Sequence, residues 1–127
     1  MLATKTANTS QELIEIIEGV VVAQGSAGTN TAGSPNFADL TAGAFADVLA
    51  GDSVYISGIA TPFVVSSKTD DNHIVMTTNI ATAHTADGVW RVKRGGIGLS
   101  ALQWPPYRDT PVAGKWYVFY NTTTFGV

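Results

Sequence analysis

The first clear pattern along the chain is the start of a helix. Thr9 is followed three positions later by Glu12, the spacing of a capping box, in which each side chain accepts a hydrogen bond from a backbone N–H group. Gly19 is a suitable residue for the C-terminal end, because glycine readily leaves the helical conformation. These signals predict a helix over Ser10–Glu18.

The predicted helix has one apolar stripe. Leu13, Ile14 and Ile17 fall on that stripe, and the glutamates of the segment favour the opposite side. A helix of about nine residues is too short to be stable by itself in water. We therefore expect the stripe to dock on the rest of this chain or on a partner.

Beyond Gly19 the apolar period changes to two, the period of a β-strand. Gly25–Pro35, rich in Gly, Ser, Thr and Asn, is predicted to be a loop, and a short turn of helix is expected around Ala44–Leu49. Two predicted strands flank the turn at Asp70–Asn72, and a hairpin is their simplest pairing. The full set of predicted strands is Val20–Ala23, Val54–Ile56, Phe63–Ser66, Ile74–Met76, Val89–Lys93 and Trp116–Tyr120.

About six short strands separated by turn residues predict a mainly β fold, a small closed barrel or a sandwich. We expect a single β-rich domain with four parts: an N-terminal segment and helix (1–18), a β core (19–93), an extended arm (94–114), and a last strand with a tail (115–127). The last strand is apolar on both faces, so we expect both faces to be covered, with a neighbouring subunit as a candidate for one cover.

The expected arm has no regular period, yet it is apolar and aromatic in places. A structureless segment of this length is usually functional or disordered, and disorder would leave its aromatic side chains exposed. We therefore expect the arm to lie against a partner. The residues that make it apolar are Leu99, Leu102, Trp104, Pro105, Pro106 and Tyr107.

Composition narrows the class of protein. A length of 127 residues fits one domain, and no apolar run approaches the roughly twenty residues that cross a bilayer. The pattern indicates a soluble chain without a secretory signal. The absence of cysteine excludes disulfides and every cysteine-based metal site. Charged residues make up 13%, about half the usual share, and such a surface is easily covered by neighbouring subunits.

The charge is unevenly distributed along the sequence. Residues 1–60 sum to -5 and residues 61–127 to +2. Complementary patches steer association, so this asymmetry favours head-to-tail contact between copies if it survives folding. Scattered, solvated charges explain it equally well.

The residues suited to catalysis or metal binding do not form a known motif. His73 and His84, with the acids at 70, 71 and 87, have no recognised metal-site spacing, so we expect structural roles for them and no cofactor. Arg91, Lys93 and Arg94 form a basic cluster, but the sequence pI of about 5.1 argues against nucleic acid as the main partner. Neutralisation of a nearby acid is the better explanation of that cluster.

One segment resembles a known group of proteins. The run Ala50–Gly58, then Phe63–Val65, Asp71–Met76 and Trp90–Val92, resembles the small β-modules of tailed-bacteriophage virion proteins, which occur in capsid decoration, neck and tail components. The similarity lies in the strand pattern and the turn residues and covers about a third of the chain. It implies a non-catalytic structural role in a symmetric particle.

The expected function is therefore a bacteriophage virion structural protein, a capsid decoration or cement subunit or a neck or tail component. It would be located in the virion and assembled in the host cytoplasm. Its partners would be copies of itself and other virion proteins, with no membrane involved. The alternative is a receptor- or glycan-binding module of a phage fibre. The candidate interface residues are Leu13, Ile17, Leu102, Trp104, Pro105, Pro106, Tyr107 and Phe125.

Overall fold

The computed structural model of the chain describes residues 2–97 and 114–121, which belong to two compact units. The barrel unit comprises Val21–Arg94, and the terminal unit comprises Met1–Val20 with Gly95–Val127. Among the described residues, no helix has the length and apolar character needed to cross a membrane. The elements are β1 (Leu2–Ala7), α1 (Ser10–Glu18), β2 (Gly19–Asn30), β3 (Ser34–Ala38), β4 (Ser53–Ile56), β5 (Phe63–Asp70), β6 (His73–Ile80), β7 (His84–Gly95) and β8 (Trp116–Asn121).

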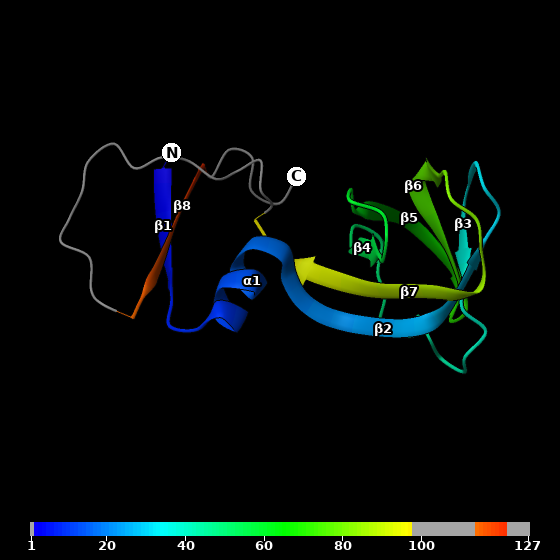
Figure 1. Cartoon of the computed structure of the whole chain (residues 1–127), viewed down its shortest axis with the longest axis horizontal. Helices are drawn as coiled ribbons and strands as arrows, with labels where there is room; N and C mark the ends of the chain where they lie inside the picture. Colours follow the sequence, from blue (N-terminus) through cyan, green and yellow to red (C-terminus); the bar gives the residue numbers. More distant parts are fainter. Residues whose placement is uncertain (1, 98–113, 122–127) are drawn as a thin grey trace. The chain divides into compact units, whose positions relative to one another are not determined.

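Six antiparallel strands close into a barrel in the order β2-β3-β6-β5-β4-β7 (Figure 1). The prediction of a mainly β fold with a small closed barrel is confirmed. The predicted hairpin is also confirmed, since β5 pairs with β6 around the turn after Asp70. Strands β4 and β5 begin close to their predicted positions, whereas β6 and β7 extend well beyond the predicted segments.

Alternate side chains of the barrel strands point inward and form one hydrophobic core. At its centre the ring centroids of Phe45 and Trp90 lie 4.8 Å apart, and Phe37 meets Trp90 edge to face at 6.5 Å. Aromatic pairs at such distances add to the stability gained by burial. The core residues are Phe37, Phe45, Val48, Val54, Ile56, Phe63, Val65, Ile74, Met76, Ile80, Trp90 and Val92.

The loop predicted over Gly25–Pro35 is wrong for most of its length, because β2 continues to Asn30 and β3 begins at Ser34, which leaves only residues 31–33 as a turn. The glycines there permit close packing. A Cβ on Gly25 would lie 2.7 Å from Trp90 Cζ2, and a Cβ on Gly28 would overlap Phe37 Cζ. Glycine inside a strand marks such close approaches. The glycines that suggested a loop are therefore explained by Trp90 and Phe37, whose rings pack directly on the backbone of β2.

Strand β3 is not evident from the sequence because it contains Pro35, and proline is uncommon inside strands. The register between β3 and β6 shifts between Ser34 and Asn36, so the proline lies at a β-bulge. A bulge is one of the few places where a strand tolerates a residue without an N–H group. The rest of β3 pairs regularly, with Phe37 opposite Ile74.

The segment between β3 and β4 closes part of the core. The helical turn predicted at Ala44–Leu49 is replaced by successive hydrogen-bonded turns, such as Val48 N to Phe45 O at 3.0 Å. Phe45 and Val48 are fully buried. The Asn72 carboxamide donates to the carbonyls of Asp39 and Thr41, both at 2.7 Å. These bonds tie the segment to the β5–β6 hairpin.

In the terminal unit, the predicted helix and its caps are confirmed. Glu12 N donates to Thr9 Oγ1 at 3.1 Å, and the Glu12 carboxylate accepts from Asn8 N at 2.8 Å. Gly19 caps the C-terminal end with φ of 100°, a conformation that favours glycine.

The apolar stripe of α1 differs from the predicted one. Leu13 and Ile16 pack against buried Ile97 and Val118, whereas Ile14 is 42% exposed. Ile97 N also donates to Ile16 O at 3.0 Å. The predicted arm thus begins as ordered chain, with residues 94 and 95 ending β7 and Ile97 packed on the helix.

The last strand is not part of the barrel, contrary to the prediction. β8 pairs antiparallel with β1, a strand that the sequence pattern did not reveal. Within this unit β8 is only partly covered. Val118 is buried, whereas Trp116 on the same face is 51% exposed and Tyr117 on the opposite face is 36% exposed. Whether a neighbouring subunit covers these exposed residues stays a prediction.

Candidate functional site

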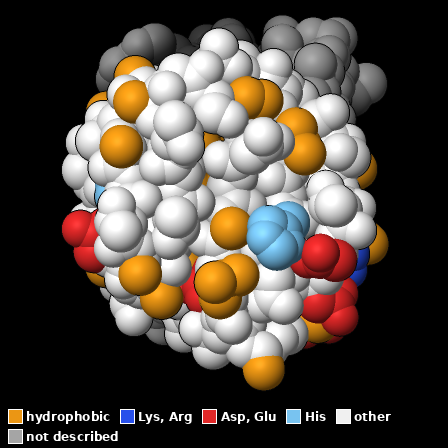
Figure 2. Space-filling model, turned by 90° about the vertical axis from the view of Figure 1, so that its right-hand side faces the viewer, with side chains coloured by type: hydrophobic (Ala, Val, Ile, Leu, Met, Phe, Trp, Pro, Cys, Tyr) orange, Lys and Arg blue, Asp and Glu red, His pale blue; other side chains and the backbone are white. Residues whose placement is uncertain are grey.

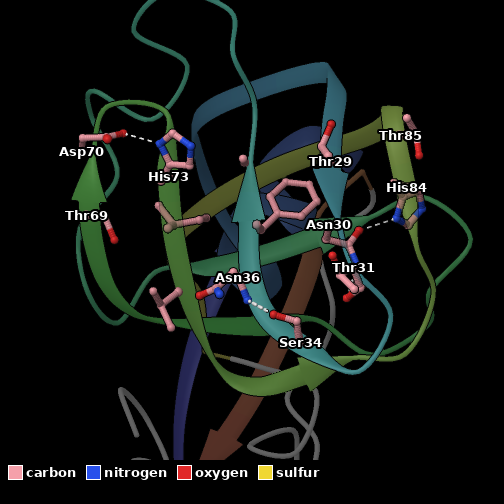
Figure 3. Close-up of a pocket in the computed structure, with 14 residues that line it drawn as sticks. Thr29, Asn30, Thr31, Ser34, Asn36, Thr69, Asp70, His73, His84 and Thr85 are labelled. Atoms are coloured by element: carbon pink, nitrogen blue, oxygen red, sulfur yellow. Dashed lines mark hydrogen bonds and ion pairs between the residues drawn. The ribbon is translucent and has the colours of Figure 1, made fainter.

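The barrel unit carries a pocket of about 670 Å³ over β3. Figure 3 shows Thr69, Asp70 and His73 on one side of β3, and Asn30, His84 and Thr85 on the other. Its volume lies within the usual range for small-molecule sites. The lining residues are Thr29, Asn30, Thr31, Ser34, Asn36, Phe37, Ala38, Thr69, Asp70, His73, Ile74, Val75, His84 and Thr85.

One wall of the pocket holds a hydrogen-bonded histidine and aspartate. His73 Nδ1 lies 2.8 Å from Asp70 Oδ1, and the same oxygen accepts from Asn72 N at 2.8 Å. The hydrogen bond from His73, followed by that from Asn72, holds the pKa of Asp70 below its ordinary value. Asp70 is therefore ionised at neutral pH. The two hydrogen bonds involve Asp70 Oδ1 and His73 Nδ1, so neither of them occupies Asp70 Oδ2 or His73 Nε2.

The other wall holds a second oriented imidazole. Asn30 is buried, and its Nδ2 donates to Thr82 O at 2.8 Å, so its Oδ1 is the acceptor facing His84 Nδ1 at 2.8 Å. His84 Nδ1 must then carry the proton. In the neutral ring, Nε2 is left as an acceptor.

The rim beside His84 has an unusual backbone. Ala86 has φ of 54°, a left-handed conformation that is uncommon for a residue other than glycine. Its N–H donates to Thr29 Oγ1 at 2.8 Å, and Thr85 N donates to Asp87 Oδ1 at 3.0 Å. These two bonds hold the rim residues Thr29 and Thr85 in place.

The most buried acid of the barrel stabilises the core and lies outside the pocket lining. Asp39 is 1% exposed, and its Oδ2 accepts from Trp90 Nε1 at 2.9 Å while its Oδ1 accepts from Thr41 N at 2.9 Å. Burial raises the pKa of Asp39, but the bonds from Thr41, Trp90 and the Ala27 backbone outweigh burial and lower it. Asp39 is thus a buried carboxylate held by donors.

The second buried acid explains part of the basic cluster. Asp52 accepts from Arg94 Nε and from an Arg94 terminal nitrogen, both at 2.8 Å, and from Leu49 N at 2.9 Å. Burial raises the pKa of Asp52, and the bonds from Arg94 and Leu49 reverse the effect and lower it. The prediction that this cluster neutralises a nearby acid is confirmed for Arg94. Lys93 lies 4.9 Å from the centre of the Tyr55 ring.

The structure brings together some of the residues singled out in the sequence and not others. His73, His84 and Asp70 line one pocket, whereas Asp71 pairs with Lys68 at 3.2 Å. Within the described part of the chain, His, Asp and Glu side chains do not gather in a group of three that could hold a metal ion.

Two of the predicted interface residues belong to α1. Leu13 packs inside the terminal unit and Ile17 is half-buried. The other six lie outside the described residues: Leu102, Trp104, Pro105, Pro106, Tyr107 and Phe125.

The pocket itself was not predicted. Its walls combine strand ends that are distant in sequence, such as Asn30 and His84, which are 54 residues apart. Strand β3, which runs between the two walls, was not among the predicted strands, and its first two residues fell in the predicted loop. The available signal was the density of Thr, Ser and Asn around the two histidines, a composition also typical of loops. Figure 2 shows a face whose side chains are mostly uncharged, with a histidine beside acidic groups. No family model, curated protein or solved structure matches the chain.

Proposed function

We propose that this chain is a non-catalytic structural subunit of a tailed-bacteriophage virion, in the first place a capsid decoration or cement subunit and in the second a neck or tail component. The observation that carries the proposal is the position of the segment that resembles phage modules. That segment, Leu49–Val92, supplies β4, β5, β6 and most of β7, four of the six strands of the barrel.

The hydrogen bonds and ion pair inside the barrel support a structural role. Asp39 with Trp90, and Asp52 with Arg94, link segments more than forty residues apart through buried or half-buried charged groups. Such bonds are stronger than neutral ones and fix geometry. A subunit repeated across a particle needs this rigidity, because each copy must present the same surface.

Exposed apolar side chains support contact with other virion proteins. Leu40 is 77% exposed and Leu49 is 57% exposed, both on the segment between β3 and β4. Covering either leucine would contribute about 1.5 to 3 kcal/mol by area. That amount is small for one copy but adds up over a shell of identical subunits.

The arm provides the test of this proposal. Aromatic anchors often dominate an interface, so Trp104→Ala with Tyr107→Ala should abolish incorporation into particles while the amide NMR spectrum of the isolated protein keeps its barrel signals. Asn79→Ala, an exposed polar change on β6, is the control and should incorporate normally. Normal occupancy of the double variant would defeat the proposed role of the arm.

The alternative function, a receptor- or glycan-binding module of a phage fibre, draws its support from the pocket over β3. The double variant Trp104→Ala, Tyr107→Ala distinguishes the two functions. A decoration subunit would lose its place in the particle, whereas a fibre module would keep its place and lose binding to cells. The chemistry of the pocket allows a more specific inference.

A further inference from the structure

We propose that the pocket over β3 binds a short neutral saccharide. The inference goes beyond the structural role and does not depend on it. Ten of the fourteen lining side chains are polar or charged, and Asp70 is the only acid and no Lys or Arg is among them. Such a lining suits an uncharged ligand with many hydroxyl groups.

The hydrogen-bonding groups match sugar hydroxyls, which both donate and accept. Asp70 Oδ2 can accept, the Asn36 carboxamide can do both, and the hydroxyls of Thr29, Thr69 and Ser34 can do both. The Nε2 atoms of the two oriented histidines add acceptors when the rings are neutral. Because Asp70, His73 and His84 are already fixed by bonds of 2.8 Å, little side-chain freedom is lost on binding.

The pairing of β3 with β6 places polar and apolar side chains in a checkerboard. Asn36 lies opposite Val75, and Ala38 lies opposite His73. Successive residues of a strand point to opposite faces, so these four share the outer face of the barrel, while Phe37 and Ile74 point into the core. A sugar ring has hydroxyl edges and C–H faces. Asn36 and His73 can hydrogen-bond to the hydroxyl edges of the ring, and Ala38 and Val75 can pack against its C–H faces.

Other ligand classes fit less well. An anion such as phosphate would meet the Asp70 carboxylate and no cationic lysine or arginine. A peptide commonly binds by adding a strand to a free sheet edge, but β3 lies between β2 and β6 in a closed barrel. Binding must therefore use side chains, which is how a saccharide is recognised.

The test is an amide NMR titration of the full chain with separate neutral sugars: glucose, galactose, mannose, N-acetylglucosamine, maltose and lactose. We expect at least one sugar to shift the amide signals of residues 29–38, 69–75 and 84–85, and to leave the terminal unit unchanged. Asn36→Ala should weaken that binding about three- to tenfold, the effect of one lost hydrogen bond. Asn79→Ala is the matched control on an exposed face outside the pocket and should bind as the unmodified chain does.

If Asn36→Ala does not fold, His73→Ala serves as the second pocket variant, since His73 is an exposed side chain. The inference is overturned if none of these sugars shifts the pocket signals. It is equally overturned if the pocket variant and Asn79→Ala bind alike, or if a neutral Ser/Thr/Asn heptapeptide shifts the pocket signals and the sugars do not. Each result is independent of incorporation into particles, so this inference and the virion proposal can fail separately.

Discussion

Replacing Trp90 by Phe tests whether the buried carboxylate of Asp39 depends on the indole N–H. The change removes a 2.9 Å hydrogen bond to a side chain that is 1% exposed. Leaving a buried polar group short of one partner costs about 1 to 3 kcal/mol, more for a charged group. The smaller ring also leaves a void beside Phe45, which adds about 1 kcal/mol. We expect a total loss of about 3 kcal/mol in the free energy of unfolding.

The loss can be measured by urea unfolding followed through the amide NMR signals of Ile74 and Val92, both buried in the barrel. With a slope of about 2 kcal/mol per molar urea, the midpoint should fall by about 1.5 M. Trp116→Phe, at an exposed position of the terminal unit, is the control and should leave the barrel midpoint unchanged.

The pH dependence separates the hydrogen bond from packing. Because the pKa of Asp39 is lowered in the folded state, its contribution to stability is present above about pH 4, the unfolded value, and is lost as pH falls through the lower folded value. In Trp90→Phe the pKa is lowered less, so the difference from the unmodified chain should narrow between pH 7 and pH 3. An equal difference at both pH values would refute the hydrogen-bond argument and leave only packing.

Three further changes test other parts of the framework. Gly25→Ala should lower the stability of the barrel by about 2 to 3 kcal/mol, because its Cβ would lie 2.7 Å from Trp90 Cζ2 and 2.8 Å from Asp39 Oδ2. Gly33→Ala is the control, since Gly33 has φ of 76° but open space around it, and it should lose only about 1 kcal/mol. Equal losses for the two variants would contradict the packing role of Gly25. Arg94→Ala leaves buried Asp52 without its two charged donors and should lower the free energy of unfolding, by less than the loss of a fully buried pair would, because the Arg94 side chain is 42% exposed. Since the pKa of Asp52 is lowered, the Arg94→Ala loss should shrink below about pH 4 in urea unfolding, whereas Arg91→Ala, at an exposed position, should be neutral at any pH. Thr9→Ala should destabilise α1 by about 1 kcal/mol, seen as faster amide exchange over residues 10–18; unchanged exchange would show that the cap is not needed.

Local signals in the sequence predicted the helix and most of the barrel strands. Thr9, Glu12 and Gly19 each act within one turn of the helix, so their effect is readable without knowledge of the fold. Strands β4 and β5 likewise begin where turn residues give way to alternating apolar ones. These elements depend on neighbours in sequence, which is why the predictions hold.

The failures have a common physical origin in contacts between distant residues. Gly25 and Gly28 have a loop composition, and only the aromatic rings of Trp90 and Phe37 explain why they belong to a strand. Pro35 in β3 is tolerated because of a bulge opposite β6. The pairing of β1 with β8 joins the two ends of the described chain, and no local pattern specifies that partner.

The candidate site was only partly predictable for the same reason. His73 and Asp70 are three residues apart, so a hydrogen bond between them could be inferred from proximity. His84 and Asn30 are 54 residues apart, and their bond requires the barrel. The pocket between these two pairs therefore emerges only from the folded chain.

The most direct test of the central claim is quantitative mass spectrometry of phage particles purified by density gradient from the lysate in which this chain is made. The account predicts that the chain co-purifies with the particles at a fixed copy number relative to the major capsid protein, set by the symmetry of the shell, neck or tail. Its absence from purified particles, while it remains abundant in the free protein of the same lysate, would contradict the account.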